Sequence, residues 1–389
     1  MGPFVLSQYA SERGHTHVTI DEFNAGFTDE PGYLDYARVG PLSTSAAEET
    51  LAFTQVLQRA RHGSLDNFAE QDARLRTAAS LVTGFRAEAI VFQPNTTQGI
   101  MHAMFGLTGG VLLSADEFPS LPIAAVRAME ALHTVQPAWL ETDHGKVTPG
   151  QIREQLESNV AAVAVSLVDA RTGYLCDIEG IRQVIGDRLL IVDAIQGFGV
   201  VDAPWEAADV VLSGGQKWCR AGWGTGIMAL SSRALERLTP VFSGFSGTEE
   251  AEPWGEVPPP ASDARAFRVS NPDPIAEARL AASLEEIARV GVPAINAAVA
   301  ERASRVIDLA DEFAIAVVSS RDEQERAGLV VLEPPAEQVT LLTASLHNHG
   351  VTATTRQGRV RLSVHSGTSG ETLEMLRAAF VSYSSAASY

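Results

Sequence analysis

Short apolar runs alternate with amphipathic stretches between residues 87 and 238, and this alternation constrains the fold more than any other feature of the chain. The apolar runs have the length of buried strands, and the stretches between them have helical periodicity. Such a pattern is typical of a mostly parallel sheet covered by helices on both faces, with ligands at the carboxyl ends of the strands. The expected strands are 89–92, 111–114, 161–167, 189–192, 209–212 and 226–230, and the expected helices include 97–105, 121–132 and 148–156.

The chain changes character after residue 242. Residues 243–263 are rich in Gly, Pro, Ser and Glu, which favours a long exposed loop of the kind that often forms a lid or an interface arm. Helical patterns follow at 274–290 and 293–313, and then a smaller unit with strands 329–332, 351–355 and 360–364 and helices 339–348 and 370–382. We therefore expect an α/β protein with a large domain over residues 20–264 and a smaller α+β domain built from residues 1–19 and 265–389.

Charge and cysteine content exclude several classes of function. The net charge of −19 repels nucleic-acid backbones and anionic membranes. The two cysteines, Cys176 and Cys219, are too few for a disulfide framework or a zinc site, and we expect no bound metal. The sequence has neither a run of about 18 apolar residues nor a secretory signal, so we expect a cytoplasmic protein.

Lysine is rare in this chain. Only Lys146 and Lys217 are lysines, against 27 arginines (29 basic residues minus two). Arginine cannot replace a lysine that must lose its proton and attack a carbonyl, because guanidinium stays charged. Lys217, which lies between Gly214-Gly215-Gln216 and Trp218, is therefore the first candidate for chemistry. The scarcity of lysine alone does not exclude the alternative that Lys217 is a surface lysine at a turn.

Asp193 directly follows the apolar strand 189–192 and precedes Lys217 by 24 positions (217 minus 193). A carboxylate at the end of such a strand is costly to bury unless it pairs with a cation. This interval has the length of one strand, one loop and a second strand, so both side chains can reach the same crevice. An aspartate facing the pyridine nitrogen and a lysine bonded to the aldehyde are the protein groups that pyridoxal phosphate needs most. Taken alone, Asp193 could equally cap a helix or a turn.

Two further strand ends carry suitable residues. The strand that ends at Phe92 leads through Asn95-Thr96-Thr97 into a helix, whose free N–H groups and threonine hydroxyls could bind a phosphate. The strand 111–114 is followed by Phe118, whose ring could stack on a flat cofactor. The ordinary alternatives are a helix cap that binds nothing and a phenylalanine of the core.

Together these residues resemble successive motifs of the class V aminotransferase family. The motifs are Tyr33-Leu34-Asp35-Tyr36-Ala37, Asn95-Thr96-Thr97, Glu117-Phe118-Pro119-Ser120, Val192-Asp193-Ala194-Ile195-Gln196, Ser213-Gly214-Gly215-Gln216-Lys217-Trp218 and Val360-Arg361-Leu362-Ser363. The family belongs to the fold-type I pyridoxal phosphate enzymes, which have a mostly parallel sheet between helices and a smaller α+β domain. It includes cysteine desulfurases, kynureninases, isopenicillin N epimerase-like proteins and ergothioneine-pathway lyases, and the resemblance covers nearly the whole chain.

The resemblance implies a role for each matching residue. Lys217 would be the Schiff-base lysine, Asp193 would hold the ring nitrogen, and Phe118 would stack on the ring. The remaining cofactor contacts would come from Gln196 near the phenolic oxygen and from Thr96, Thr97, Ser213 and Gln216 at the phosphate. Arg361 would grip the substrate carboxylate, as a planar guanidinium can, and Ala37 would line the substrate site. Arg359 shares the face of Arg361, so a salt bridge could instead occupy both. Relatives build the site between two subunits, which implies a homodimer.

Departures from the family limit the reaction that can be carried over. Gln216 stands where many relatives have a histidine, and Phe118 stands where many desulfurases have one. No cysteine follows Cys219, which argues against cysteine desulfurase activity because that reaction uses a small-domain thiol. We expect an aminotransferase, with a β-eliminating C–S lyase of the ergothioneine-pathway type or an epimerase as alternatives. A cofactor-free scaffold with the same core would not need Lys217, Asp193 and the threonine turn together.

Overall fold

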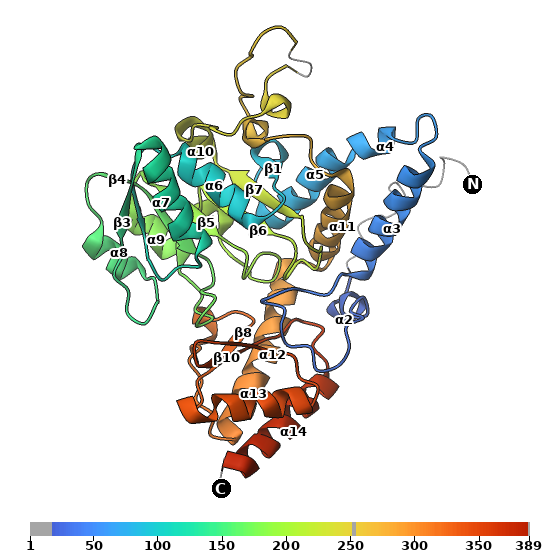
Figure 1. Cartoon of the computed structure of the whole chain (residues 1–389), viewed down its shortest axis with the longest axis vertical. Helices are drawn as coiled ribbons and strands as arrows, with labels where there is room; N and C mark the ends of the chain where they lie inside the picture. Colours follow the sequence, from blue (N-terminus) through green and yellow to red (C-terminus); the bar gives the residue numbers. More distant parts are fainter. Residues whose placement is uncertain (1–17, 251–253, 388–389) are drawn as a thin grey trace.

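The computed structural model describes residues 18–250 and 254–387. A large part surrounds a seven-stranded sheet, and a smaller part below it in Figure 1 surrounds a three-stranded sheet. The strand order of the large sheet is β1-β7-β6-β5-β4-β2-β3. Its strands are β1 (Ile90–Phe92), β2 (Gly109–Leu113), β3 (Val135–Trp139), β4 (Val160–Ser166), β5 (Leu189–Asp193), β6 (Val210–Gly214) and β7 (Gly226–Leu230).

The large sheet is mostly parallel, as expected from the sequence. Strands β2 to β6 pair in parallel, whereas β7 runs antiparallel to both β1 and β6. Alternate side chains of each strand enter two separate cores, so that Leu190 and Val192 face one core and Leu189 and Ile191 face the other. The carboxyl ends of β2, β4, β5 and β6 therefore meet at one edge, where a site is expected.

Helices cover both faces of this sheet. Apolar residues of α6 (Thr96–Gly106), α7 (Ser120–Leu132) and α10 (Ser232–Arg237) fill one core. The opposite core is filled from α5 (Gln71–Thr83), α8 (Pro149–Gln155), α9 (Ile178–Ile185) and α11 (Pro274–Val290). Single 3₁₀ turns complete the connections: η1 (Ala87–Ala89), η2 (Trp205–Ala207), η3 (Phe245–Gly247), η4 (Ala264–Phe267), η5 (Glu323–Glu325) and η6 (Ala336–Gln338).

One strand of the large sheet was not expected from the sequence. Strand β3 contains Gln136 and Pro137, which interrupt the apolar run that marks its neighbours. It lies at the edge of the sheet, where a proline can be tolerated because no further strand needs its N–H. The strand expected at 351–355 is also shorter and later, because only Thr354–Arg356 form β9.

The smaller sheet has the strand order β8-β10-β9 and is antiparallel throughout. Its strands β8 (Leu329–Leu332), β9 and β10 (Arg359–Ser363) lie beside α12 (Val292–Glu312), α13 (Val339–Asn348) and α14 (Gly370–Ala387). Tyr33 and Asp35 form bridges with Thr352 and Ser363. The segment around residues 32–37 therefore runs along this sheet and joins it to the large part.

The domain boundaries stay a prediction. The part of the predicted small domain that precedes residue 18 lies outside the described residues. Helix α11, which follows the predicted boundary at residue 264, packs against α5 and against α3 (Thr44–Arg59). The long α12 that follows α11 contributes to the core of the smaller part.

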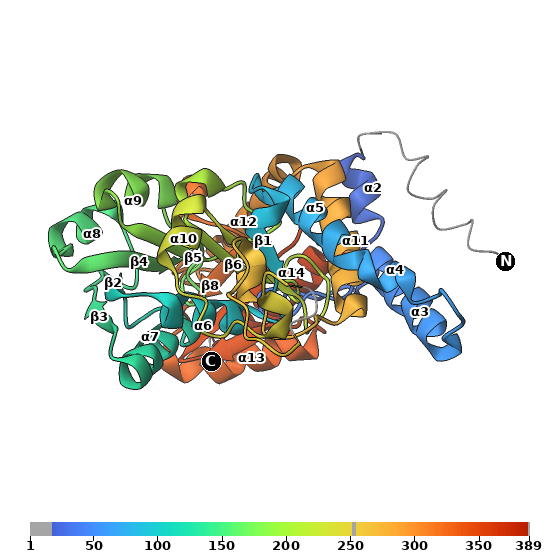
Figure 2. The same cartoon turned by 90° about the horizontal axis from the view of Figure 1, so that it is seen from above.

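Two segments project from the body of the protein. Helices α2 (Ile20–Asn24), α3 and α4 (Asp66–Ala69) lie at one side, and the end of α3 with α4 forms an arm that extends away from the sheet in both views (Figures 1 and 2). The second segment comprises the described residues 243–250 and 254–263 of the expected loop, in which Trp254 and Val257 are 87% and 99% exposed. No described helix is both long and apolar enough to span a membrane.

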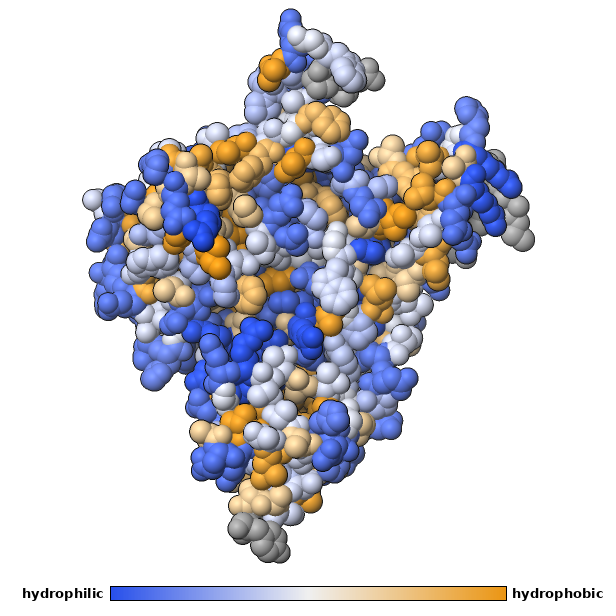
Figure 3. Space-filling view, viewed as in Figure 1, coloured by the Kyte–Doolittle hydropathy of each residue, from blue (hydrophilic) through white to orange (hydrophobic). Residues whose placement is uncertain are grey.

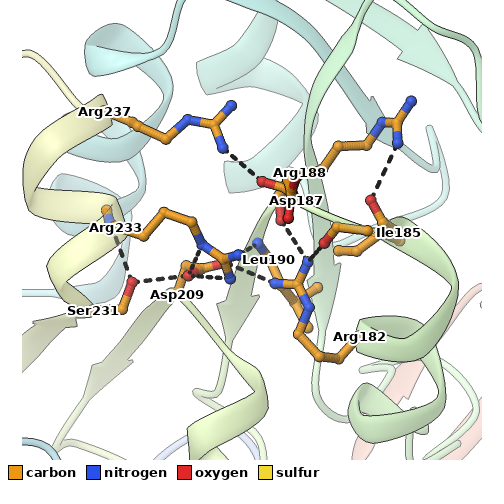
Figure 4. Close-up of polar contacts among 11 residues, drawn as sticks. Arg182, Ile185, Asp187, Arg188, Leu190, Asp209, Ser231, Arg233 and Arg237 are labelled. Atoms are coloured by element: carbon orange, nitrogen blue, oxygen red, sulfur yellow. Dashed lines mark hydrogen bonds and ion pairs between the residues drawn. The ribbon is translucent and has the colours of Figure 1, made fainter.

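Asp209 organises the amino-terminal edge of the sheet, opposite the expected site (Figure 4). Its carboxylate is 2% exposed and accepts hydrogen bonds from the Leu190 N–H at 2.8 Å and the Ser231 hydroxyl at 2.8 Å. Arg182 of α9 and Arg233 of α10 also donate to it, at 2.8 and 2.9 Å. One buried carboxylate thus connects two strands with helices on both faces.

We expect Asp209→Asn to lower the stability by about 3–5 kcal/mol, because it leaves two arginines without their anion. This corresponds to a fall of about 5 °C in the thermal unfolding midpoint for a chain of this length. Asp187→Asn is the matched control, because Arg237 bonds only to the main-chain oxygen of Asp187. Equal midpoints for the two variants would contradict the role of Asp209.

Candidate active site

Lys217 lies in the turn between β6 and β7, at the edge where the carboxyl ends of the parallel strands meet. Its ammonium nitrogen is 5.7 Å from the centroid of the Phe118 ring, which is 40% exposed. The N–H of Gly40 donates to the Gln216 carbonyl at 2.8 Å, and a side chain at Gly40 would collide with the Lys217 carbonyl oxygen. Residue 40 must therefore be small for the chain to cross beside Lys217.

The surroundings of Lys217 favour its neutral form. The pKa of Lys217 is lowered to about 8, mainly by burial; the charge of Asp193 opposes this shift, those of Arg361 and Arg356 add to it, and that of Asp35 opposes it. An amine with a pKa near 8 is partly unprotonated at neutral pH, so it can act as a nucleophile or a base.

Asp193 ends β5 with its side chain 2% exposed. One carboxylate oxygen accepts a hydrogen bond from the Ile195 N–H at 3.1 Å. Burial raises the pKa of Asp193 to about 6, because that single hydrogen bond and the charge of Lys217 compensate only part of the lost hydration. The buried carboxylate is therefore under-compensated, as expected of a group that awaits a cationic partner.

The amino terminus of α6 offers an anion site. Asn95 caps the helix, because its side-chain oxygen accepts a hydrogen bond from the Gln98 N–H at 2.9 Å. The N–H groups that precede Gln98 in the first turn have no partner within the helix and can bind an anion. The Thr96 hydroxyl is buried and has no hydrogen-bond partner within the described part of the chain. Thr97 bonds to Ser120 at 2.9 Å, which brings this terminus beside the segment that carries Phe118. A phosphate here would satisfy the orphaned Thr96 hydroxyl.

Ser213 and Gln216 flank the same turn. Ser213 is 1% exposed, and its hydroxyl donates to the Gly214 carbonyl at 3.1 Å. The Gln216 amide folds back over Gly214, where a Cβ would collide with it. To contact a phosphate, the Ser213 hydroxyl would turn its single hydrogen from the Gly214 carbonyl to the anion, whereas the Gln216 amide NH₂ can donate directly.

Gln196 and Ala37 are joined by a hydrogen bond. The Gln196 amide donates to the Ala37 carbonyl at 3.1 Å and accepts from the Trp218 ring N–H at 3.1 Å. The Ala37 N–H in turn donates to the Ser363 hydroxyl of the smaller sheet at 2.9 Å. One amide hydrogen of Gln196 remains for the predicted contact with the cofactor, and Ala37 links the two parts of the protein beside Lys217.

Arg361 reaches the site from β10. Its guanidinium donates to the Ala170 carbonyl at 3.2 Å and lies 3.9 Å from the carboxylate of Asp35. The Arg361 Nε–H is buried without a partner among the described residues. Arg359 is instead bonded to Glu333 at 2.8 Å, so one shared partner does not occupy both arginines. Arg361 thus retains a donor for a substrate carboxylate.

Three residues of the site were not assigned from the sequence. Asp35 is 1% exposed and accepts from the Thr354 hydroxyl at 2.8 Å. Burial raises the pKa of Glu117 to about 7, although its carboxylate accepts from the Ser166 N–H at 3.1 Å. Arg356 is the third and belongs to β9. Asp35 and Glu117 stand within the motifs that carry the family resemblance, which is the signal that could have identified them.

The surface around the junction of the two parts is strongly hydrophilic on the face shown in Figure 3, whereas apolar residues gather over the upper part and the arm. The residues that line the site fit pyridoxal phosphate: an orphaned hydroxyl at a helix terminus for phosphate, a buried carboxylate for the ring nitrogen and a neutralisable lysine for the aldehyde.

Known proteins share both the fold and the sequence signature. A cysteine desulfurase from Thermococcus onnurineus NA1 superposes with a TM-score of 0.81 at 19% identity, covering 93% of this chain and 97% of that one. The cystine C–S lyase C-DES, in complex with its product cysteine persulfide, superposes with a TM-score of 0.82 at 18% identity, covering 90% and 97%. These likenesses establish the fold.

The sequence comparisons identify the family. A kynureninase from Deinococcus radiodurans is 25% identical over 240 residues, which span 59% of this chain and only 57% of that protein. The sequence signature described as Aminotransferase class-V matches residues 46–388. The chain therefore belongs to the class-V aminotransferase family of pyridoxal phosphate-dependent enzymes.

Proposed function

We propose that this enzyme acts at the Cα of an amino acid, and that amino-group transfer is its reaction. The observation that supports this most is the position of Lys217, a partly buried amine of lowered pKa that lies over Phe118 and whose pKa also responds to the charges of Asp193 and Arg361. Pyridoxal phosphate bound here supplies an aldehyde for the substrate amine and a ring that withdraws electrons from Cα.

Three residues of the chain would carry out the other steps of the reaction. Arg361 holds the substrate carboxylate and thereby fixes which Cα bond faces Lys217. The neutral Lys217 amine takes the Cα proton and can return it to a neighbouring carbon on the same side, as amino-group transfer requires. Asp193 keeps a proton on the ring nitrogen, which preserves the electron demand on Cα.

A β-eliminating lyase is the second candidate. Such a lyase needs the same base, the same cofactor and the same arginine to bind the substrate carboxylate. The similar solved structures include a cystine C–S lyase. Persulfide chemistry on a protein thiol is not supported, because Cys176 and Cys219 are both buried. Burial raises the pKa of both thiols, which keeps them protonated.

The products of the holoenzyme distinguish these reactions. We would add single amino acids and S-substituted cysteines without a keto-acid acceptor and record the cofactor absorbance and the released keto acid. Stoichiometric conversion of the cofactor to pyridoxamine phosphate supports transfer, and continuous release of pyruvate supports elimination. Exchange of the α-hydrogen with loss of optical activity, and no keto acid, would indicate epimerisation. A protein that never takes up pyridoxal phosphate would overturn the whole proposal.

The lowered pKa of Lys217 predicts how capture of the cofactor depends on pH. With a pKa of about 8, half of the Lys217 amines are neutral at pH 8, against roughly one in three hundred for an ordinary lysine. The rate at which the apo-protein binds pyridoxal phosphate should therefore rise through pH 8 and level off above about pH 9. Stopped-flow absorbance measures this rate, and a midpoint near the ordinary lysine pKa would contradict the lowered pKa of Lys217.

We also propose a homodimer. Apolar side chains are exposed on two separate projecting segments: Leu51 and Leu57 of α3 are 63% and 50% exposed, and Trp254 and Val257 of the 243–263 loop are 87% and 99% exposed. Apolar residues exposed on projecting segments are typical of an interface between subunits. Light scattering of the holoenzyme, with an expected mass twice that of one chain, tests the proposal.

A further inference from the structure

A tight turn places three arginines on one face of the smaller sheet. Strands β9 and β10 are joined by Gln357-Gly358, whose φ angles of 52° and 79° are both positive, as a two-residue hairpin turn of type I′ requires. The resulting register sets Arg356 directly opposite Arg359. Opposed residues of an antiparallel pair share a face, and so does every second residue of a strand. Arg356, Arg359 and Arg361 therefore point to the same side.

Two of these arginines are paired and the third is not. Arg359 donates to Glu333 at 2.8 Å, and Arg361 donates to a main-chain carbonyl and faces Asp35 at 3.9 Å. The exposed Arg356 side chain has neither a hydrogen bond nor an ion pair with any residue that the structure describes. Like charges directly opposite each other destabilise a hairpin, so the pairing of Arg356 with Arg359 has a cost that no contact of Arg356 offsets.

The unpaired guanidinium acts on the active site. Burial is the main reason for the lowered pKa values of Lys217 and Arg361, and the charge of Arg356 lowers both further. Arg356 also lies on the face of the sheet from which Arg361 reaches the site, so its free cation lies on the side of the sheet that faces the Lys217 amine. In a chain of net charge −19, an unpaired guanidinium at this place favours an anion that the rest of the surface would repel.

We propose that Arg356 binds a second anionic group of the substrate, so that the preferred substrates are amino acids whose side chain ends in an oxyanion. This inference rests on the proposed function, because it assumes that Arg361 holds the α-carboxylate of an amino acid. Carboxylate, sulfinate and sulfonate ends all offer the coplanar or forked oxygens that a guanidinium binds with two N–H groups.

The first test measures turnover by the holoenzyme. L-aspartate, L-glutamate, L-cysteine sulfinate and L-cysteate represent the oxyanions, and L-asparagine and L-glutamine are the uncharged counterparts of the carboxylates. We expect Arg356→Gln to lower kcat/KM for the acidic substrates by about 10- to 100-fold and to change it less than about twofold for the amides. The order of the losses among the four acids identifies which oxyanion the site prefers.

Arg359→Gln is the matched control, because Arg359 lies on the same face next to Arg356 but is bonded to Glu333. We expect it to leave the ratio of acidic to amide turnover within about twofold of wild type, as is usual for an exposed ion pair. An equal loss in both variants would show a general field effect and would overturn the specific role of Arg356. A loss confined to Arg356→Gln supports it.

A binding measurement separates this inference from the proposed function. Succinate and butanoate differ by one carboxylate, and calorimetry gives their dissociation constants for the holoenzyme without any turnover. Tighter binding of succinate, lost at least about tenfold in Arg356→Gln, supports the second anion position even if no amino acid is converted. If the holoenzyme converts amino acids but Arg356→Gln changes neither succinate binding nor the acidic preference, the proposed function stands. In that case Arg356 serves only to protect the exposed edge strand.

Discussion

Replacing Lys217 by alanine should abolish turnover, with kcat falling by about 10⁴-fold or more, because one amine provides both the bond to the cofactor and the movement of the Cα proton. Its position supports both tasks: it is partly buried, its pKa is lowered to about 8, and it lies 5.7 Å from the centroid of the Phe118 ring. The variant should still bind pyridoxal phosphate through the α6 terminus, but borohydride should no longer fix the cofactor to the protein. Mass spectrometry of the reduced protein measures this directly.

Lys146→Ala is the control that this chain offers, because Lys146 is the only other lysine. Lys146 is 40% exposed, lies 3.5 Å from Glu325, and stands 5.2 Å from the centroid of the Tyr174 ring. Its loss should change neither turnover nor borohydride fixation by more than about twofold. Fixation that persists in Lys217→Ala and disappears in Lys146→Ala would refute the assignment.

The strands and strand-end residues could be predicted because a buried parallel sheet leaves a strong trace in the sequence. Strand β5 is apolar on both faces and ends in Asp193, so the contrast between the apolar strand and this carboxylate marks Asp193 as a candidate site residue. Strand β3 left no such trace, because it is an edge strand that contains Pro137. Whether a strand could be predicted from the sequence therefore depended on how many of its side chains are buried, and less on the intrinsic strand propensity of its residues.

The contacts between the two parts of the protein could not be predicted in the same way. Asp35 meets Arg361, and Ala37 meets both Gln196 and Ser363, only because the segment around residues 32–37 runs along the smaller sheet. These pairs are 159 to 326 positions apart in the sequence, and no periodicity relates them. Motif resemblance named some of these residues, but their partners follow from tertiary packing alone.

The second large effect is expected at Asp193, where activity and stability should change in opposite directions. Asp193→Asn should lower kcat by about 10²- to 10³-fold, because a neutral amide cannot hold the ring nitrogen in its protonated form. The hydrogen bond from the Ile195 N–H can be kept by the asparagine oxygen, so the local backbone should not change. A shift of the cofactor absorbance band together with the loss of turnover would show that Asp193 acts through the ring.

The apo-protein should become more stable in the same variant. Burial raises the pKa of Asp193 from 3.8 to about 6, which corresponds to about 3 kcal/mol of destabilisation once the carboxylate is ionised in both the folded and the unfolded state. Below pH 3.8 the group is protonated in both states and has no effect. The cost of the wild-type residue then grows between pH 3.8 and about 6 and stays constant above that. Thermal unfolding of the two apo-proteins should therefore give a higher midpoint for Asp193→Asn at pH 7.5, by roughly 4 °C, and equal midpoints near pH 3.8. A variant that is less stable at pH 7.5 would show that Asp193 already has a cationic partner without the cofactor, and the assignment to the ring nitrogen would fail.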